Sequence, residues 1–490
     1  MVKPVSQQAE ENTWKIRGLL KKEECTMDDT KISNMTALEL TEQYSLARLS
    51  PVTVTEAMLD RINRINPKIN AFHHISADKA LISAREAEKR WKDGKPLSPI
   101  DGVPTAIKDG LLMKGIPVYR GSVANAAEMQ EWNADAPVVL RLEENGAVIL
   151  GKTTMCDYGM LASGYSSKFG PTRNPWSLDH NSGGSSSGSA AAVAAGLCPI
   201  IVGTDIVGSI RNPASFCGLY GHKPSFGRVP FYPQTSPSVC AGPIARSVAD
   251  AARLLTIISR PDKRDPTALP FANVNYEDAI KSEPTKLKIG FMRSIGFGPS
   301  PHDEVLKICE AAVKVFEGSG NEIRDILPPF KNEDIKKAEN FYRTRTLAEL
   351  DLLTPETRAK AEVINTWASE AQNYSGMDHY RDYLGTQDLR SRMFSAMEGY
   401  DLLLLPTVPI PPYKAENAGL DDGDIFAPWC NTFVFNLTQQ PAISVPCGKT
   451  STGLPVGLQI IGRVQEDICV LRAAKTYEDY VGCSIAIPKM

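Results

Sequence analysis

The segment SGGSSSGSAAAVAAG, residues 182–196, constrains the fold more than any other stretch of this chain. Alanine is the strongest helix former and glycine suits a helix end, so the second half of the segment predicts a short helix that ends near Gly196. Glycines ahead of a helix let backbone N–H groups face a ligand. A flexible Gly/Ser linker is the alternative, but such linkers are not normally followed at once by a small-residue helix. The segment therefore predicts a turn and helix built into a site.

Strand and helix patterns alternate ahead of this segment. The stretches AFHHIS (71–76), GVPTAIKD (102–109) and AVILGKT (147–153) have the apolar character of strands. APVVLRLEENG (136–146) and the charged segment 78–91 predict helices. This alternation is typical of an α/β protein with much parallel strand pairing.

Capping boxes at Thr36 and Thr53 predict two amphipathic helices before the first strand. Apolar residues recur at helical spacing after both positions, and we expect Pro67 to stop the second helix. The segment NPWSLDHN (174–181), between the strands and the serine-rich turn, is expected to be a loop.

The domain organisation follows from where the strand patterns return. Residues 1–34 have low apolar content and are expected to form an N-terminal extension. Residues 262–424 are expected to form a largely helical peripheral region, and the strand pattern returns toward the carboxyl end in DLLLLPTV (401–408), PAISVPCG (441–448) and PVGLQIIG (455–462). We therefore predict an α/β fold in which residues 35–485 form a single large domain, with a mixed twisted β-sheet covered by helices on both faces.

Composition limits the partners and the compartment. The net charge is −3 and no long run of one sign occurs, so neither nucleic acid nor a membrane surface is an expected partner. The N-terminus lacks the apolar core of a secretory signal, which predicts a cytoplasmic protein. The ten cysteines lie far apart without a Cys-x-x-Cys pair, so we expect reduced thiols and no structural metal.

The serine-rich turn allows a nucleophile elbow as one interpretation. GSSSG fits the G-x-S-x-G pattern and would make Ser186 the nucleophile of an α/β-hydrolase. That chemistry needs an apolar strand directly before the serine and an Asp and a His after it. The preceding segment is polar and the six histidines have no diagnostic context, so this interpretation is the weaker one.

A second motif, GTDIVGSIRNPASFCGLYGHKPSFGRVP (203–230), decides between the interpretations. Together with GGSSSGSAAAVAAG and the earlier PTAIKD, it resembles the amidase signature family, serine hydrolases that cleave amide bonds with a Ser–cis-Ser–Lys triad. The three motifs agree with the family in order and spacing, and the similarity extends from about residue 36 to about residue 480. The resemblance implies the amidase signature fold and a reaction without a cofactor.

The resemblance also implies the roles of three residues. Ser209 corresponds to the nucleophile, and Ser185 to the bridging serine, which follows a cis peptide bond from Gly184. Lys108 corresponds to the base. Chemistry agrees with these roles, because a serine hydroxyl needs a neighbour that takes its proton, and burial lowers the pKa of a lysine toward neutrality.

Backbone and supporting groups follow from the same motifs. The implied oxyanion hole consists of the backbone N–H groups of Ile206, Val207, Gly208 and Ser209. The family usually has glycine at the position of Val207, so a positive φ there would strain the backbone. Further residues are expected to support the site: Asp205 and Arg211 as a buried ion pair, and Ser186 and Ser187 as helix caps that hydrogen-bond around Ser185.

The substrate is expected to be a small molecule with an amide bond. In related enzymes, two segments line the acyl pocket, and here they bring seven residues near it: Met155, Tyr158, Met160, Ile425, Phe426, Trp429 and Phe433. These side chains are apolar or aromatic, so an aryl or alkyl amide, an anilide or a carbamate fits better than a small polar dicarboxylate. Whether the chain forms a homodimer is left open.

Two other functions remain possible on this fold. One is the glutamine-hydrolysing subunit of an amidotransferase, although PQTSPSVCAGPIA lacks the acidic LDQ element that such subunits show before their Gly-Pro. The other is a catalytically inactive binding protein, against which the complete set of one lysine and two serines argues. Labelling by a fluorophosphonate probe distinguishes the inactive protein from an enzyme.

Overall fold

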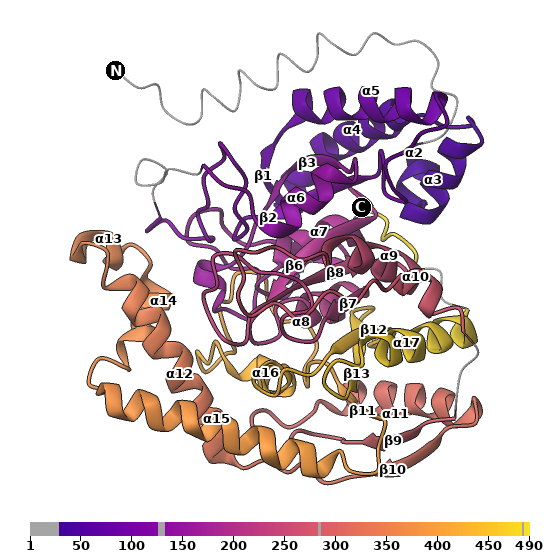
Figure 1. Ribbon diagram of the computed structural model, residues 1–490. Coiled ribbons are helices and arrows are strands. Elements are labelled where there is room, and N and C mark those ends of the chain that lie inside the picture. The colour runs from indigo at the N-terminus through magenta and orange to yellow at the C-terminus, as the bar shows by residue number, and fades with distance from the viewer. Residues whose placement is uncertain (1–28, 126–132, 283–285, 483–484) are drawn as a thin grey trace.

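The computed structural model describes residues 29–125, 133–282, 286–482 and 485–490 (Figure 1). Of the predicted extension, residues 1–34, the first 28 lie outside the described residues. Residues 29–34 form helix α2 (Asp29–Asn34), whose Ile32 is completely buried against the domain.

A mixed sheet runs through the whole molecule and confirms the predicted fold class (Figure 1). Its strands lie in the order β1 (Phe72–Ile75), β3 (Val148–Thr153), β2 (Pro104–Lys108), β6 (Ile200–Asp205), β8 (Cys240–Ala245), β7 (Tyr220–Lys223), β12 (Ala442–Lys449), β13 (Pro455–Gly462), β11 (Leu402–Pro406), β9 (Lys288–Phe291) and β10 (Glu322–Asp325). The strands predicted near the C-terminus thus join the same sheet as those predicted near the N-terminus.

Helices cover the sheet and its ends. After α2 they are α3 (Ala37–Ser45), α4 (Pro51–Ile69), α5 (Ala77–Lys92), α6 (Pro137–Glu144), η2 (Asp157–Gly159), α7 (Ser187–Ala194), α8 (Arg211–Cys217), α9 (Val248–Ile258), α10 (Tyr276–Ala279), α11 (Asp303–Gly318), α12 (Asn332–Leu350), α13 (Pro355–Ala359), α14 (Glu362–Ser369), α15 (Gly376–Ala396), η3 (Ala427–Trp429), α16 (Cys430–Leu437) and α17 (Asp467–Val481).

Successive residues of the central strands face opposite sides of the sheet, because side chains alternate along a strand. In β3, Val148 and Leu150 belong to one apolar core, which they share with α4, α5 and α7. Ile149, between them, belongs to the other core, which includes apolar residues of α6 and α9. Every residue of β3 is buried, as expected for a strand covered on both faces.

Two local predictions near the N-terminus need correction. The capping box at Thr36 is present, but the one predicted at Thr53 is not: α4 already begins at Pro51, and Ser50 Oγ accepts the N–H groups of residues 52 and 53. The helix also continues through Pro67 to Ile69, and its C-cap residue Asn70 has a φ of 53°. Proline removes one hydrogen bond, whereas the two further residues bury Ile69 in the core, so the helix gains by continuing.

The segment expected as a loop before the serine-rich turn is a hairpin. Strands β4 (Arg173–Asn174) and β5 (Ser177–Asn181) pair antiparallel in a separate two-stranded sheet. Asn174 closes the hairpin because its side chain accepts the N–H of Trp176 and donates to two backbone carbonyls. The turn and helix after it match the prediction: α7 ends close to Gly196, which has a φ of 68°.

The sheet topology brings the candidate residues together at one edge. Strands β3, β2 and β6 are neighbours and run parallel, so their carboxyl ends meet on the same side. These ends carry Thr153, Lys108 and Asp205. Open α/β sheets bind ligands at the carboxyl ends of their strands, and the candidate site lies there.

Residues 262–424 do more than cover the sheet. They supply β9, β10 and β11 as well as the long helices α12 and α15, which pack against each other at the lower left of Figure 1. Tyr342 of α12 is completely buried, and its hydroxyl donates to the carbonyl of Ile206 at 3.2 Å. The helical region therefore reaches the loop that carries Ser209.

Candidate active site

Lys108 is the last residue of β2, and its side chain is fully buried. Its Nζ donates to Ser185 Oγ at 2.8 Å, to Thr204 Oγ1 at 2.8 Å and to the Thr204 carbonyl at 3.3 Å. Burial removes water from the ammonium group and lowers the pKa of Lys108 to about 7, although Cys156 and Asp205 oppose that shift. A lysine in this setting exchanges a proton near neutral pH.

Ser185 follows a cis peptide bond from Gly184, and both backbone groups of Gly184 are held in place. The Gly184 N–H donates to Asn212 Oδ1 at 3.0 Å, and its carbonyl accepts Trp429 Nε1 at 3.3 Å. A Cβ on residue 184 would approach the Leu161 carbonyl to 2.2 Å, so only glycine fits. These contacts hold the Ser185 hydroxyl against Lys108.

Ser209 lies in the loop between β6 and α8. Its carbonyl accepts the N–H of Ser186 at 3.2 Å, which joins this loop to the residue next to Ser185. The Ser209 Oγ is buried and has no hydrogen-bond partner among the described residues. The structure thus brings the two loops with the predicted serines into direct contact.

A buried ion pair organises the Ser209 loop. Arg211 Nε donates to Asp205 Oδ2 at 3.0 Å and Arg211 Nη2 donates to Oδ1 at 2.9 Å, while both side chains are fully buried. The carboxylate of Asp205 also accepts the N–H groups of Gly208 at 2.7 Å and Ile210 at 3.0 Å. Burial opposes ionisation, but the charge and hydrogen bonds of Arg211 outweigh it and lower the pKa of Asp205 to about 2.

The same bonds correct the predicted oxyanion hole. Because the Gly208 N–H already donates to Asp205, it is not available to a substrate in this structure. Val207 is not strained: the positive φ, 136°, belongs to Gly208, where a Cβ would come within 2.1 Å of Thr432 Oγ1. Val207 is buried, and its carbonyl accepts Thr432 Oγ1 at 2.7 Å.

Ser186 and Ser187 do not cap α7 as predicted. Ser186 occupies the N-cap position but makes no capping bond with its side chain. Its hydroxyl donates to the carbonyl of Thr204 at 3.2 Å and accepts the N–H of Thr204 at 3.3 Å. Ser187 Oγ is buried without a partner among the described residues. These backbone bonds fix Ser186 to β6, and the partner of its hydroxyl is a backbone group rather than a histidine, which argues against the elbow.

A cavity of about 200 Å³ opens onto Ser185. Apolar side chains form most of its wall: Leu112, Val118, Met155, Ile206, Phe231 and Val239. Tyr158, Thr204, Arg120 and Arg345 also line it. The site therefore combines a buried lysine, a hydroxyl and a largely apolar chamber.

Of the seven residues expected around the substrate, Met155 and Tyr158 line this cavity. The lining does not include the other five, Met160, Ile425, Phe426, Trp429 and Phe433, which are all buried. Three of these are core residues that pack together, because the ring of Phe426 lies 6.0 Å from Trp429 and 5.5 Å from Phe433. Trp429 acts on the site indirectly, through Gly184.

Sequence reasoning missed Thr204, Arg120 and Arg345. Thr204 precedes Asp205 in the signature motif, so its closeness to Lys108 could have been inferred from the parallel pairing of β2 with β6. No pattern in the sequence indicates that α12, more than two hundred residues from Arg120, contributes Arg345 to the same cavity.

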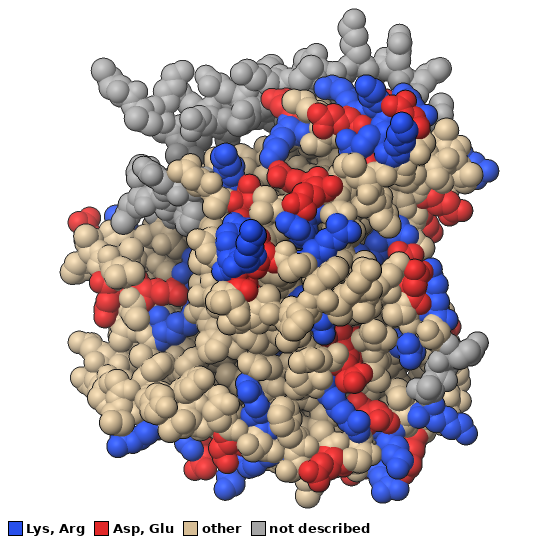
Figure 2. Space-filling model, in the orientation of Figure 1, with Lys and Arg blue, Asp and Glu red and all other residues tan. Residues whose placement is uncertain are grey.

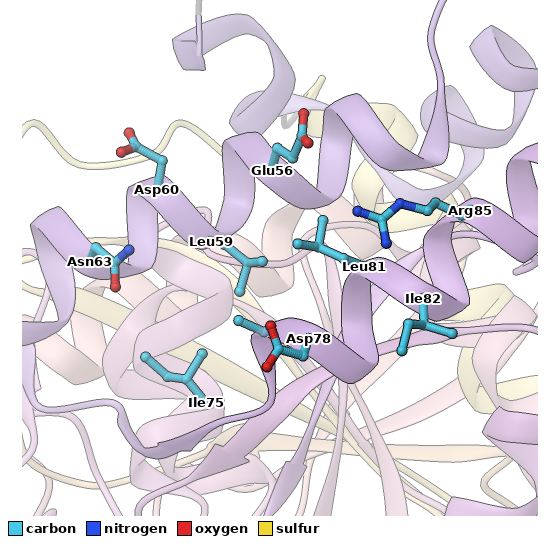
Figure 3. Close-up of a pocket in the computed structure, with 10 residues that line it drawn as sticks. Glu56, Leu59, Asp60, Asn63, Ile75, Asp78, Leu81, Ile82 and Arg85 are labelled. Atoms are coloured by element: carbon cyan, nitrogen blue, oxygen red, sulfur yellow. The ribbon is translucent and has the colours of Figure 1, made fainter. Parts of the chain in front are cut away.

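Another cavity, of about 290 Å³, lies between α4 and α5 (Figure 3). Its wall combines Leu59 and Leu81 with the charged Glu56, Asp78 and Arg85, and it includes none of the predicted triad. On the face shown in Figure 2, acidic and basic side chains are interspersed. Among the described residues, no cluster of side chains could hold a metal ion and no helix is long and apolar enough to cross a membrane.

Comparisons with known proteins agree with this geometry. A family model described as Amidase matches residues 53–471. An acylamidase of Rhodococcus erythropolis is 33% identical over 470 residues, covering 92% of this chain and 96% of the relative. One subunit of the glutamyl-tRNA(Gln) amidotransferase of Geobacter metallireducens is 34% identical over 484 residues, covering 91% and 97%.

A solved structure is also similar to this chain. It is a bacterial aryl acylamidase of the amidase signature family, with a TM-score of 0.86 and 29% identity, and the match covers 94% of this chain and 99% of that one. Family model, relatives and fold agree over nearly the whole chain, and the chain belongs to the amidase signature family of amide hydrolases.

Proposed function

We propose that this chain hydrolyses an apolar aryl or alkyl amide through an acyl-enzyme on Ser209, with Ser185 as proton relay and Lys108 as base. The observation that carries the proposal is the hydrogen bond between Lys108 Nζ and Ser185 Oγ, 2.8 Å long and fully buried. A lysine with a pKa of about 7 is partly neutral at physiological pH and can accept a proton there.

The proton transfers balance as follows. Ser209 Oγ attacks the substrate carbonyl carbon and gives its proton to Ser185 Oγ, whose own proton passes to Lys108 Nζ. The backbone N–H groups of Ile206, Val207 and Ser209 are assigned to the developing oxyanion. The C–N bond then breaks, and the proton returns from Lys108 through Ser185 to the leaving nitrogen.

Water completes the cycle by the reverse path. A water molecule gives a proton to the Ser185–Lys108 pair and attacks the acyl carbon. The ester bond to Ser209 Oγ breaks, the acid leaves and Ser209 recovers its proton. No step requires a metal or cofactor, so we expect chelators to leave turnover intact.

The cavity wall supports the substrate class. Its apolar side chains suit an aryl or alkyl group beside the amide, because burial of apolar surface drives binding in such chambers. Relatives named acylamidase and aryl acylamidase support the same class. Carbamates and anilides place the same carbonyl at Ser209 and are included in the proposal.

A panel of purified-enzyme assays tests this function. We expect hydrolysis of aryl amides, alkyl amides, anilides or carbamates, and covalent labelling by a fluorophosphonate. Ser209→Ala should abolish both, and Ser185→Ala should lower turnover strongly without unfolding the protein. Ser187→Ala, which removes a buried hydroxyl in the same turn, is the matched control and should retain labelling. Labelling at Ser185 in the Ser209→Ala variant would mean that the two serines have exchanged roles.

A second function is supported by the relatives named as a subunit of glutamyl-tRNA(Gln) amidotransferase, which are about as similar as the acylamidase. It predicts release of ammonia from glutamine, with and without partner proteins. The apolar wall of the cavity favours the aryl or alkyl amide. A protein that hydrolyses none of these compounds and resists the fluorophosphonate would be an inactive binding protein.

A further inference from the structure

Two arginines line the cavity that opens onto Ser185. Arg120 lies in the segment that connects β2 to α6, and Arg345 comes from α12. They are the charged side chains of that lining among the described residues, and both are cations. An otherwise apolar chamber therefore carries positive charge of its own, which no part of the amide cleavage described above uses.

One carboxylate serves both guanidinium groups. Glu349 Oε2 accepts Arg120 Nη1 at 2.5 Å, and its Oε1 accepts Arg345 Nη2 at 2.8 Å. Two positive charges share one negative charge, so the cluster has a net charge of about +1 at neutral pH. A second anion next to the two arginines would neutralise this remaining positive charge.

The protein holds both arginines in position. Arg120 lies 4.8 Å from the ring centre of Tyr158, and its Nη2 donates to the Tyr158 carbonyl at 3.3 Å. Arg345 Nε donates to the Thr235 carbonyl at 3.1 Å. Because these contacts are already made, little side-chain freedom remains to be lost when a ligand binds.

Arg345 retains an unused donor. Its Nη1 is buried and has no hydrogen-bond partner among the described residues, while Nε and Nη2 are both engaged. A buried donor without an acceptor is costly, and a charged one more so. An acceptor on a ligand that reached Nη1 would remove that cost.

We propose that Arg345, assisted by Arg120, binds a carboxylate carried by the amide substrate. This inference rests on the proposed amide hydrolysis and narrows its substrate class from neutral apolar amides to amides with an apolar body and one acidic group. The apolar wall takes the hydrocarbon part, and guanidinium groups recognise a carboxylate through paired, charge-assisted hydrogen bonds.

Matched probe pairs test the proposal on both sides of the amide bond. The acyl-side pair is glutaryl para-nitroanilide against pentanoyl para-nitroanilide, and the amine-side pair is para-acetamidobenzoate against acetanilide. We expect kcat/KM to be about 10- to 100-fold higher for the acid in at least one pair, the effect of a charge-assisted hydrogen bond. Arg345→Gln should lower kcat/KM for that acid about tenfold more than for its neutral partner.

Arg343→Gln is the matched control on the same helix. Arg343 pairs with Glu339 at 2.8 Å and with Glu370 at 3.0 Å, and it does not line the cavity. This variant should keep the preference of the wild-type enzyme for the acid. Equal kcat/KM within both pairs, or an Arg345→Gln variant that affects acid and neutral probes alike, would overturn the proposal.

Calorimetry separates this inference from the proposed function. The Ser209→Ala protein should bind glutaryl para-nitroanilide more tightly than the pentanoyl compound, and adding Arg345→Gln should remove the difference. If the wild-type enzyme hydrolysed no probe but this binding difference were present, the carboxylate site would stand and the proposed function would fail. If the enzyme hydrolysed acidic and neutral probes equally well, the proposed function would stand and the carboxylate site would fail.

Discussion

Two charged clusters lie close to one cavity and are stabilised in different ways: Asp205 with Arg211, next to the cavity residues Thr204 and Ile206 (the catalytic end), and Glu349 with the cavity residues Arg120 and Arg345 (the arginine end). Asp205 and Arg211 are fully buried, and each charge has several short partners inside the protein. The side chains of Arg345 and Glu349 are 12% and 25% exposed, and Arg345 has a donor left over. The buried ion pair of Asp205 and Arg211 is thus compensated without a ligand, whereas Arg345 keeps an unused donor.

This difference suggests a division of labour. The buried ion pair of Asp205 and Arg211 holds the Ser209 loop in one geometry, since any rearrangement would leave a charge without compensation. The pairs of Glu349 with Arg120 and Arg345 retain some contact with solvent, so their charges are partly screened. We therefore expect mutations at the catalytic end to remove activity or stability, and mutations at the arginine end to change selectivity.

The largest effect is expected at Lys108. Lys108→Ala removes the proposed base and should lower kcat about 10²- to 10⁴-fold on an amide or carbamate substrate, measured under saturating conditions. Lys108→Arg should fail equally, because guanidinium stays protonated at any workable pH. A histidine variant that lost activity to the same degree, while Lys108→Arg kept it, would contradict the lysine mechanism.

Next in size is the loss of the buried ion pair. Asp205→Asn leaves Arg211 without its counter-charge and should lower the free energy of unfolding by about 3 to 5 kcal/mol, measured by urea titration. Asp60→Asn, in the exposed pair with Arg64, is the control and should cost about 1 kcal/mol or less. Similar losses for the two variants would show that burial does not distinguish these pairs.

A smaller effect is expected in the pH profile. Because the base must be neutral, kcat/KM of the wild-type enzyme should fall as the pH drops below about 7, the pKa of Lys108. Thr204→Val removes an acceptor that favours the charged lysine, so the pKa falls further and the acid limb moves to lower pH by up to about one unit. Thr105→Val is the control: Thr105 lies on β2, the strand of Lys108, but its hydroxyl donates to the Ile200 carbonyl, so the acid limb should stay in place.

The smallest effect is expected at the arginine end. Glu349→Gln removes the shared carboxylate and should change the free energy of unfolding by about 1 kcal/mol or less, because the pairs are partly exposed. It should also lower KM for the acidic probes severalfold, because Arg120 and Arg345 no longer share Glu349 and both attract the carboxylate of the ligand. Glu339→Gln, which pairs with Arg343 on the same helix, is the control. A large loss of stability from Glu349→Gln would place the arginine end with the catalytic end.

Much of the fold could be predicted because its signals are local. Apolar runs gave the central strands β2 and β3, and the alanine-rich run gave α7 together with its end near Gly196. The errors arose where tertiary contacts outweighed a local preference. Burial of Ile69 carried α4 past Pro67, and the backbone of Thr204 took the Ser186 hydroxyl that was predicted to cap α7.

The candidate site divides in the same way. The motifs placed Lys108, Ser185 and Ser209 on elements that the topology brings together, because parallel strands end at one edge of the sheet. The substrate wall was harder to predict: apolar character alone does not distinguish a side chain that lines a cavity from one, such as Phe433, that fills the core.

The sequence by itself determined the family, the succession of strands and helices along the chain around the serine-rich turn, and the candidates for the catalytic chemistry. These depend on short motifs and on periodicity, which act over a few residues. Tertiary structure alone decided that the Gly208 N–H belongs to Asp205, and that α12 brings Arg345 beside Arg120. Those contacts depend on the packing of elements that are distant in the sequence and on the loss of water around them, and a local sequence pattern predicts neither.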